Sequence, residues 1–157
     1  MRLTSLTVAA GLALASASFA ETVAPGNVEF DEYGAVQASL TGVAGDPANG
    51  RSVIVSKKRG NCIACHSSEA WADELFHGEV GPALDGVGGY RTAAELRGIL
   101  VNSKMTFEGT IMPAYYKVDG FNRPGDAYTG KAAKELSPLL TAQEIEDVVA
   151  FLSTLTE

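Results

Sequence analysis

The sequence predicts an all-α protein, because three segments carry helix signals and no segment reads convincingly as a strand. Each of the three has a residue suited to cap a helix, followed by apolar residues at helical spacing. The segments are residues 46–59, 92–104 and 141–155. The chain has no internal repeat, and the stretches between the helices are long and punctuated by glycine and proline. Loops of this length are uncommon in a compact domain unless they wrap a bound group.

The first predicted helix begins at Asp46, whose carboxylate can cap free backbone N–H groups, and Pro47 suits the first helical position. We expect the basic residues 57–59 to close this helix and Gly60 to stop it. The helix then leads directly into a segment that contains both cysteines of the chain.

The two later helices begin with capping boxes, in which a Thr and a Glu three residues on satisfy each other's backbone N–H groups. These boxes are Thr92-Ala93-Ala94-Glu95 and Thr141-Ala142-Gln143-Glu144. The last helix has the clearest apolar stripe, made by Ile145, Val148, Val149, Leu152 and Leu155. Residues 67–91 and 105–130 are predicted to be loops.

Residues 1–20 read as a secretory signal that is cleaved before Glu21. An arginine supplies the positive start, residues 6–14 form a short apolar core, and small residues precede the cut. That core is too short for a membrane anchor, and no later segment predicts a membrane span. Residues 21–45 show no helical stripe and are predicted to form an extended arm, either a disordered linker or a segment that wraps a partner subunit. Residues 46–157 are predicted to form one domain.

Both cysteines lie in one five-residue run, Cys62-Ile63-Ala64-Cys65-His66. This run is typical of covalent attachment of a c-type haem, because two thiols at this spacing can each add to one vinyl group of a porphyrin. The imidazole of His66 then lies under the ring and can bond the iron. A zinc site would need about four ligands, and a thioredoxin-like pair would follow a strand, whereas a helical, basic segment precedes Cys62. The sequence therefore predicts an all-α protein that carries one covalently attached haem.

The second ligand of the iron is predicted to be a methionine, the usual partner of histidine in an electron carrier. Once the signal is removed, Met105 and Met112 are available. Met112 is favoured because Pro113 fixes the backbone beside it, whereas Met105 is predicted near a helix end, where packing explains it. His77 is predicted to be a loop histidine, since it follows the haem run closely and would have to reach across the ring.

The formal net charge is −7, from 19 acidic and 12 basic residues. An acidic chain is a poor ligand for nucleic acid or for an anionic membrane surface, so we exclude both classes of partner. Haem attachment needs reduced thiols in a compartment where free thiols otherwise oxidise. Together with the signal, this requirement predicts a protein exported to a bacterial periplasm.

These features together resemble those of class I cytochromes c. The resemblance rests on the first helix, the haem run, Gly81-Pro82-Ala83-Leu84, the Met112 loop and the terminal helix, and it covers residues 46–157. It implies a small helical bundle around one haem, in which the carbonyl of Pro82 accepts a hydrogen bond from His66. The same acceptor is expected on physical grounds, since a ligating imidazole usually donates its other N–H to a fixed group.

A narrower resemblance is to the SoxX family, the small monohaem subunits of the SoxAX thiosulfate-oxidising complex. It rests on residues 60–66, 78–87, 111–116 and 139–152. The resemblance implies a heterodimer with a larger haem subunit, SoxA, which joins thiosulfate to a cysteine of the carrier protein SoxYZ, an enzyme of the L-cysteine S-thiosulfotransferase type. The substrate chemistry is expected on SoxA. This chain is expected to receive electrons and to pass them to a soluble cytochrome.

No catalytic residue is predicted in this chain, because haem attachment uses both cysteines and no acid–base cluster is obvious. Two alternative functions remain open from the sequence. One is a free-standing electron shuttle for another periplasmic dehydrogenase. The other is a haem enzyme or sensor whose iron has an open face, which predicts a high-spin ferric spectrum and ready binding of cyanide or carbon monoxide.

Overall fold

The computed structural model describes residues 21–122, 124–125, 129–133 and 135–157, and the predicted signal segment lies outside these ranges. The α-helices are α1 (Pro47–Val55), α2 (Val87–Tyr90), α3 (Ala93–Asn102) and α4 (Ala142–Leu152). Within the described ranges the β pairing is limited to one isolated bridge between Gly125 and Ala132. The all-α prediction is therefore confirmed. None of the helices in the described part of the chain is long and apolar enough to cross a membrane.

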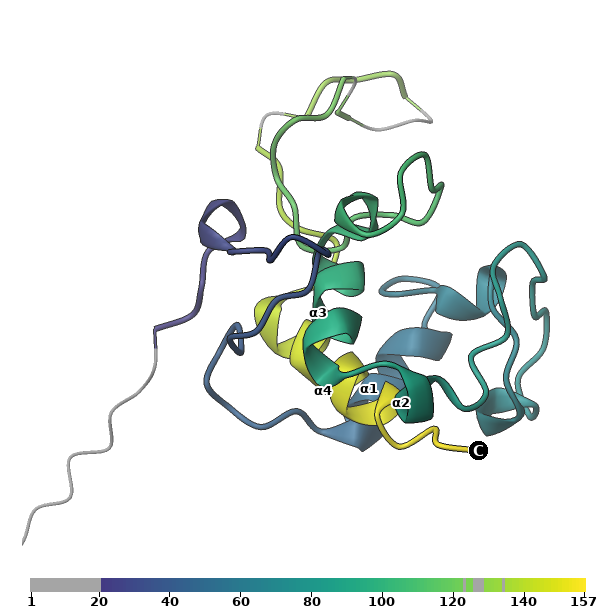
Figure 1. The fold of residues 1–157 in the computed structure, drawn as a ribbon. Coiled ribbons are helices and arrows are strands. Elements are labelled where there is room, and N and C mark those ends of the chain that lie inside the picture. Colours follow the sequence, from purple (N-terminus) through teal and green to yellow (C-terminus); the bar gives the residue numbers. More distant parts are fainter. Residues whose placement is uncertain (1–20, 123, 126–128, 134) are drawn as a thin grey trace, which may run out of the picture.

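Helices α1, α3 and α4 pack together as the core of the fold, with long loops on either side (Figure 1). Helices α1 and α4 lie close together at Gly50, where a Cβ would lie 2.0 Å from the carbonyl oxygen of Asp147. Only glycine leaves room for the two backbones at this point. The core is filled by apolar side chains of all three helices, among them Val53, Ile54, Leu96, Leu100, Ile145 and Val148.

The capping boxes at the start of α3 and α4 are both present, as predicted. In the first, the backbone N–H of Glu95 donates to Thr92 Oγ1 at 3.2 Å, and the N–H of Thr92 donates to Glu95 Oε2 at 2.8 Å. Thr141 and Glu144 make the same pair of bonds at 3.2 and 2.9 Å. These local bonds explain why the starts of both helices are readable from sequence.

The end of the first helix was predicted wrongly. Helix α1 ends at Val55, and the basic residues 57–59 lie in the turn that follows. The carbonyl of Ser56 accepts from the backbone N–H groups of both Arg59 and Asn61, each at 3.0 Å, so the chain turns here toward the cysteines. The basic side chains therefore do not cap the helix.

The loop predicted for residues 67–91 contains one short helix, α2, which has Gly88 and Gly89 within it. Glycine disfavours an isolated helix, so sequence pattern gave no signal for α2. Tertiary contact explains it: the N–H of Gly88 donates to the carbonyl of Leu155 at 2.7 Å, and a Cβ at Gly88 would lie 2.6 Å from the carbonyl oxygen of Ser153. The glycine lets this turn lie directly against the end of α4.

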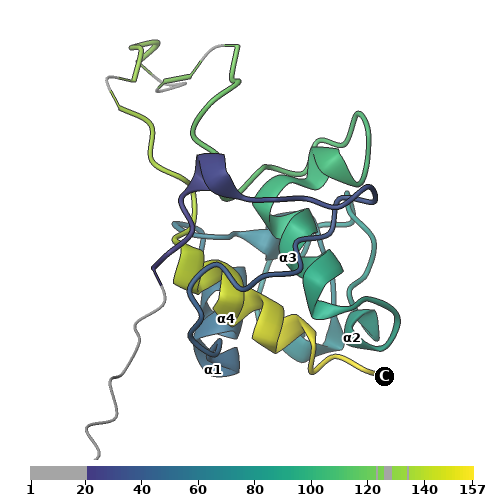
Figure 2. The same cartoon turned by 60° about the vertical axis from the view of Figure 1, so that its left-hand side comes forward.

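The extended arm, residues 21–45, crosses the faces of α3 and α4, as Figures 1 and 2 show in two orientations. Val36 and Leu40 are almost completely buried in the core. The arm is tethered at its start, because the carbonyl of Val23 accepts from the hydroxyl of Tyr116 at 2.8 Å. The described arm is extended, as predicted, but it is an ordered part of its own domain, so it is not a disordered linker.

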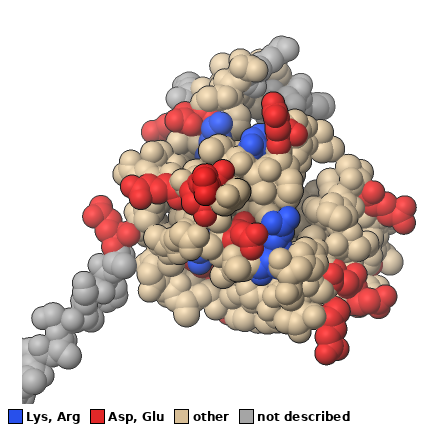
Figure 3. Space-filling view, viewed as in Figure 1, with Lys and Arg blue, Asp and Glu red and all other residues tan. Residues whose placement is uncertain are grey.

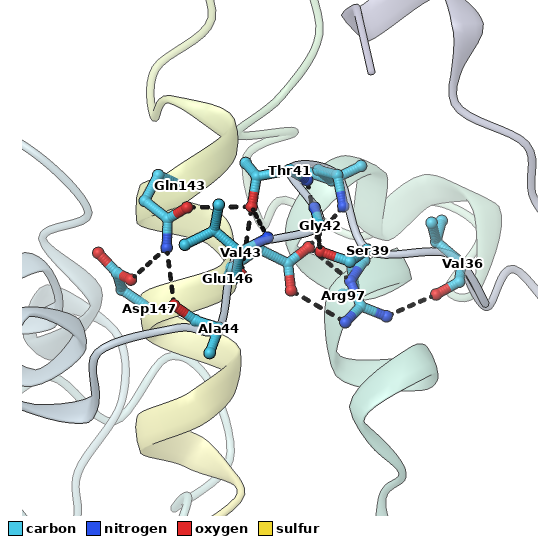
Figure 4. A network of polar contacts seen from close by, with 11 residues as sticks. Val36, Ser39, Thr41, Gly42, Val43, Ala44, Arg97, Gln143, Glu146 and Asp147 are labelled. Atoms are coloured by element: carbon cyan, nitrogen blue, oxygen red, sulfur yellow. Dashed lines mark hydrogen bonds and ion pairs between the residues drawn. The ribbon is translucent and has the colours of Figure 1, made fainter. Parts of the chain in front are cut away.

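A buried polar network holds the arm to α3 and α4 (Figure 4). The guanidinium of Arg97 makes two bonds to the carboxylate of Glu146, at 2.8 and 2.9 Å, and a third to the carbonyl of Val36 at 2.8 Å. The carboxylate of Glu146 also accepts from the backbone N–H of Leu40 at 2.7 Å. Each charge is thereby paired and hydrogen-bonded, which is the condition for placing it in a protein interior.

Candidate haem site

The haem run lies in a tight turn directly after α1. Asn61 adopts a left-handed backbone with φ of 49°, and residues 62–64 form a 3-10 turn. The N–H groups of Cys65 and His66 both donate to the carbonyl of Cys62, at 3.0 and 2.9 Å. This turn brings both thiols and the imidazole into one compact segment. Cys62 is buried, whereas Cys65 is half-buried, and neither forms a disulfide.

Cys62 lies against the buried ring of Tyr115, which sequence analysis did not identify as part of the site. The Tyr115 hydroxyl donates to the carbonyl of Gly60 at 3.1 Å. Burial raises the pKa of the Cys62 thiol to about 11, with hydrogen bonding from Tyr115 opposing the shift. Burial also raises the pKa of Tyr115, and the nearby Cys62 adds to that rise. Both groups are therefore neutral at ordinary pH, and the environment of the first thiol is apolar.

The imidazole of His66 is oriented by the carbonyl of Pro82. Its Nδ1 lies 2.7 Å from that oxygen, so Nδ1–H donates and the tautomer is set. Nδ1 is the ring nitrogen that has a partner among the described residues, which leaves Nε2 free to bind iron. Gly81 makes this approach possible, because a Cβ there would lie 2.3 Å from His66 Cε1.

Three backbone hydrogen bonds hold the Pro82 loop against the haem run. The N–H groups of Gly78, Gly81 and Leu84 donate to the carbonyls of Ile63, Cys65 and Ser67, at 2.8, 2.8 and 3.0 Å respectively. The contact is close, since a Cβ at Gly78 would lie 1.9 Å from the carbonyl oxygen of Ala64. The orientation of the imidazole is thus supported by the backbone on both sides of Pro82.

Met112 is half-buried and packs against the hydrophobic core. Its loop is attached to the end of α3, because the N–H groups of Tyr115 and Tyr116 donate to the carbonyls of Leu100 and Val101, at 3.0 and 3.2 Å. Met105 differs from Met112 in being half exposed, with 50% of its surface accessible. The apolar packing role predicted for Met105 is therefore not what the structure shows.

His77 is half-buried, and its Nε2 is shielded from solvent with no hydrogen-bond partner among the described residues. The residue lies in the loop between His66 and Pro82, as predicted. Three large apolar side chains of the same loop, Leu75, Phe76 and Val80, are well exposed.

The residues present fit a covalently attached haem. In the part of the chain that the structure describes, no group of three or more His, Cys, Asp or Glu side chains could share a metal ion. Two thiols in one turn and an imidazole with a free Nε2 are the kinds of group that a covalently attached haem needs. Glycine at position 81 is required by the imidazole itself.

The fold and this donor set define a class of small haem-carrying proteins, and comparison with known proteins identifies it. The family model for cytochrome c matches residues 48–156. The chain belongs to the cytochrome c family. Membership implies covalently bound haem c.

Within that family the chain is similar to SoxX, as the sequence predicted. It shares 56% sequence identity with a chain of the crystal structure of SoxXA from P. pantotrophus, with a TM-score of 0.82. The match covers 87% of this chain and 99% of that chain. No curated protein sequence matches this chain.

The surface of the protein is acidic, but its acidic and basic side chains are not separated into distinct patches on the face that Figure 3 shows. Figure 3 shows acidic side chains spread across the face viewed, with the fewer basic ones lying among them. Several basic residues are engaged in ion pairs: Arg51 with Asp73 at 2.5 Å, Arg59 with Glu144 at 3.3 Å and Arg91 with Glu95 at 3.0 Å. Lys57 lies over the ring of Phe76, 5.2 Å from its centroid.

Proposed function

We propose that this chain is the monohaem electron-transfer subunit of a SoxAX-type complex that oxidises thiosulfate. The observation that carries the proposal is the 56% identity to a chain of SoxXA over 87% of this sequence. Proteins this similar over nearly their whole length keep the same fold and, as a rule, the same site. The two thiols, the imidazole and the methionine of this chain are the donor set that such a subunit needs.

We assign the thiols of Cys62 and Cys65 to the two thioether bonds of one haem c. His66 Nε2 and the thioether of Met112 would be the two protein ligands of its iron. The haem, when bound, accepts and releases one electron at a time. The protein residues hold it, orient it and set its potential, and a methionine ligand favours the reduced form.

The role of Pro82 is to hold His66 in the correct tautomer. Because Nδ1–H donates to a backbone carbonyl at 2.7 Å, the imidazole is oriented and Nε2 is the ring nitrogen left for the iron. Tyr115 holds the start of the haem run by its bond to the carbonyl of Gly60. Neither residue reacts, so both are positioning residues.

The proposed partner is a larger haem subunit of the SoxA type. In that division of labour SoxA joins thiosulfate to a cysteine of SoxYZ, and this chain takes up the electrons and passes them to a downstream soluble cytochrome. With both thiols used for haem attachment, this chain has no cysteine left for sulfur chemistry. It is therefore proposed as the redox subunit of a heterodimeric enzyme and has no catalytic residue of its own. A periplasmic location follows from the predicted signal in residues 1–20.

The test of this function is co-purification from cells that express the full-length chain together with the haem-attachment apparatus. We expect the exported polypeptide to start at Glu21, to carry one haem that acid–acetone does not extract, and to bring down a second haem protein in equal amount. Deletion of the gene should abolish thiosulfate-dependent electron transfer. A monomer that accepts electrons from unrelated donors, with thiosulfate oxidation unchanged on deletion, would instead identify a free-standing shuttle.

The axial ligand is tested separately by spectroscopy. Met112→Ala is expected to abolish the methionine–iron charge-transfer band and to open the iron to carbon monoxide. Met105→Ala removes a half-exposed methionine and serves as the matched control. An unchanged band in Met112→Ala, or its loss in Met105→Ala, would overturn the assignment. A high-spin ferric spectrum of the unmodified protein would point to an open-site haem enzyme or sensor.

A further inference from the structure

The backbone of Met112 is held by hydrogen bonds on both of its polar groups. Its N–H donates to Thr110 Oγ1 at 3.3 Å. Its carbonyl accepts two side-chain hydrogen bonds, one from Ser103 Oγ at 2.8 Å and one from the ammonium of Lys104. A backbone carbonyl oxygen has two lone pairs, so it can accept both of these bonds at once.

Both donors come from the short 3-10 turn, Ser103–Met105, that follows α3. The turn is itself capped, since the Asn102 side chain accepts from the N–H of Lys104 at 3.4 Å. Ser103 has no accessible surface at all. A buried hydroxyl must find a partner, and the carbonyl of Met112 is the partner that this one has.

These bonds are not needed to attach the loop to α3. That attachment is already made by Tyr115 and Tyr116, whose N–H groups donate to the last turns of α3. The Ser103 and Lys104 bonds act closer to the sulfur, at the peptide group of Met112 itself. Holding the ammonium of a long, exposed lysine against one carbonyl also costs side-chain entropy, which a purely structural loop contact would avoid.

We propose that Ser103 and Lys104 are positioning residues that clamp the carbonyl of Met112 and so keep its thioether on the haem iron and set the reduction potential. The proposal rests on the assignment of Met112 as axial ligand. Ser103 supplies a fixed, buried donor that sets the direction of the Met112 backbone. Lys104 supplies a second donor and a positive charge beside the ligand, and a nearby positive charge favours the iron state that carries one more electron.

The variants are Ser103→Ala and Lys104→Met in the haem-loaded, full-length protein. Each has a matched control of the same chemistry. Ser153→Ala also removes a serine hydroxyl that donates to a backbone carbonyl, that of Val149 at 2.7 Å, but at the end of α4. Lys117→Met removes a lysine whose ammonium lies over the ring of Phe121, 5.5 Å from its centroid, so it contacts an aromatic ring where Lys104 contacts a carbonyl. Lys104→Arg keeps the charge and the donor and is the rescue variant.

We expect Ser103→Ala to weaken the methionine–iron charge-transfer band and to raise the rate of carbon monoxide binding by the reduced protein by about tenfold, because thioether dissociation limits that rate. Lys104→Met should lower the reduction potential by about 59 mV, the equivalent of a tenfold change in the oxidised-to-reduced ratio for one electron. Lys104→Arg should restore it. Both controls should leave the band and the potential unchanged.

The inference is overturned if Ser103→Ala and Lys104→Met each keep the band, the carbon monoxide rate and the potential of the unmodified protein while Met112→Ala loses the band. That result would leave Met112 as the ligand and the proposed function intact. A band that survives Met112→Ala overturns the assignment and the clamp together. If Ser103→Ala does not fold, Lys104→Met decides alone, because Lys104 is exposed and its replacement leaves the core unchanged.

Discussion

Arg97 on α3 and Glu146 on α4 form a buried ion pair, with two hydrogen bonds between the guanidinium and the carboxylate. Their side chains are only 9% and 5% exposed. The pair joins three parts of the chain, since Arg97 also donates to the carbonyl of Val36 and Glu146 accepts from the N–H of Leu40. The arm that covers the helices is thus fastened by charge as well as by apolar contact.

Arg97→Met should therefore destabilise the protein strongly. It leaves the Glu146 carboxylate buried without its cation and the Val36 carbonyl without its donor, and breaking a buried pair costs about 3–5 kcal/mol. Chemical unfolding of the haem-loaded protein, followed by circular dichroism, measures this loss. Arg91→Met is the control, because the Arg91–Glu95 pair is partly exposed and its loss should cost less than about 1 kcal/mol. Equal losses for the two variants would contradict the role given to burial.

Gly81→Ala should disturb the orientation of His66 without unfolding the protein. The added Cβ would lie 2.3 Å from the imidazole, so either the ring or the Pro82 loop must move and the Nδ1 bond to Pro82 lengthens. Perturbing the outer partner of a metal ligand typically costs about 10–100-fold in affinity or activity. We expect the electron-transfer rate to fall by a factor in that range and the potential to shift. Gly26→Ala is the control, since a Cβ at Gly26 meets nothing within 4 Å.

Structural features that depend on residues close together in the sequence could be predicted from the sequence alone. The capping boxes at Thr92 and Thr141 are closed by residues three positions away, and the stripe of the last helix repeats every turn. The haem run is equally local, because both thiols and the histidine lie within five consecutive residues and can be recognised without knowledge of the fold. These features were sufficient to predict an all-α fold and a haem site.

Features that depend on contacts between segments far apart in the sequence could not be predicted in this way. The arm has no periodic pattern. Val36 and Leu40 join the core through apolar packing and through the bonds that Arg97 and Glu146 make to their backbone. The early end of α1 is different, because it depends on local bonds: the carbonyl of Ser56 accepts from the N–H groups of Arg59 and Asn61, three and five residues further on. Tyr115 also lies far from the haem run in the sequence. Its hydroxyl donates to the carbonyl of Gly60, which is 55 residues earlier in the chain, and this pairing could not be predicted from local pattern.

Gly50→Ala should destabilise the protein by separating α1 from α4. The new Cβ would lie 2.0 Å from the carbonyl oxygen of Asp147 and 2.9 Å from the Cβ of Phe151, and neither can move without moving the helix. Forcing atoms into a packed contact costs about 1–3 kcal/mol, and backbone contacts place this case at the upper end. Gly26→Ala, at an exposed position, should change the free energy of unfolding by less than about 0.5 kcal/mol. A stable Gly50→Ala variant would mean that the helices do not meet at this glycine.

Asp147 should make the stability of the protein depend on acid pH. Burial by itself would raise the pKa of this carboxyl, but hydrogen bonds from the N–H of Asp46 at 2.8 Å, from Asn49 at 2.6 Å and from Gln143 at 2.9 Å outweigh burial and hold the pKa below its ordinary value. A carboxyl whose pKa is lower in the folded state stabilises the fold above its unfolded pKa of about 3.9, and that stabilisation is lost as the pH falls further.

Asp147→Asn removes the charge that these donors bind, so it should cost about 1–3 kcal/mol of unfolding free energy at pH 7. The difference from the unmodified protein should shrink as the pH is lowered through about 4 toward 2, because the native carboxyl is then protonated as well. Unfolding curves measured at a series of pH values test both statements. The exposed Asp119 provides the control, and Asp119→Asn should show neither the loss at pH 7 nor its convergence in acid. The prediction is contradicted if Asp147→Asn lowers the free energy of unfolding by the same amount at pH 7 and below pH 3. The loss would then come from the different geometry of the amide, and the charge of Asp147 would contribute nothing to the contact between α1 and α4.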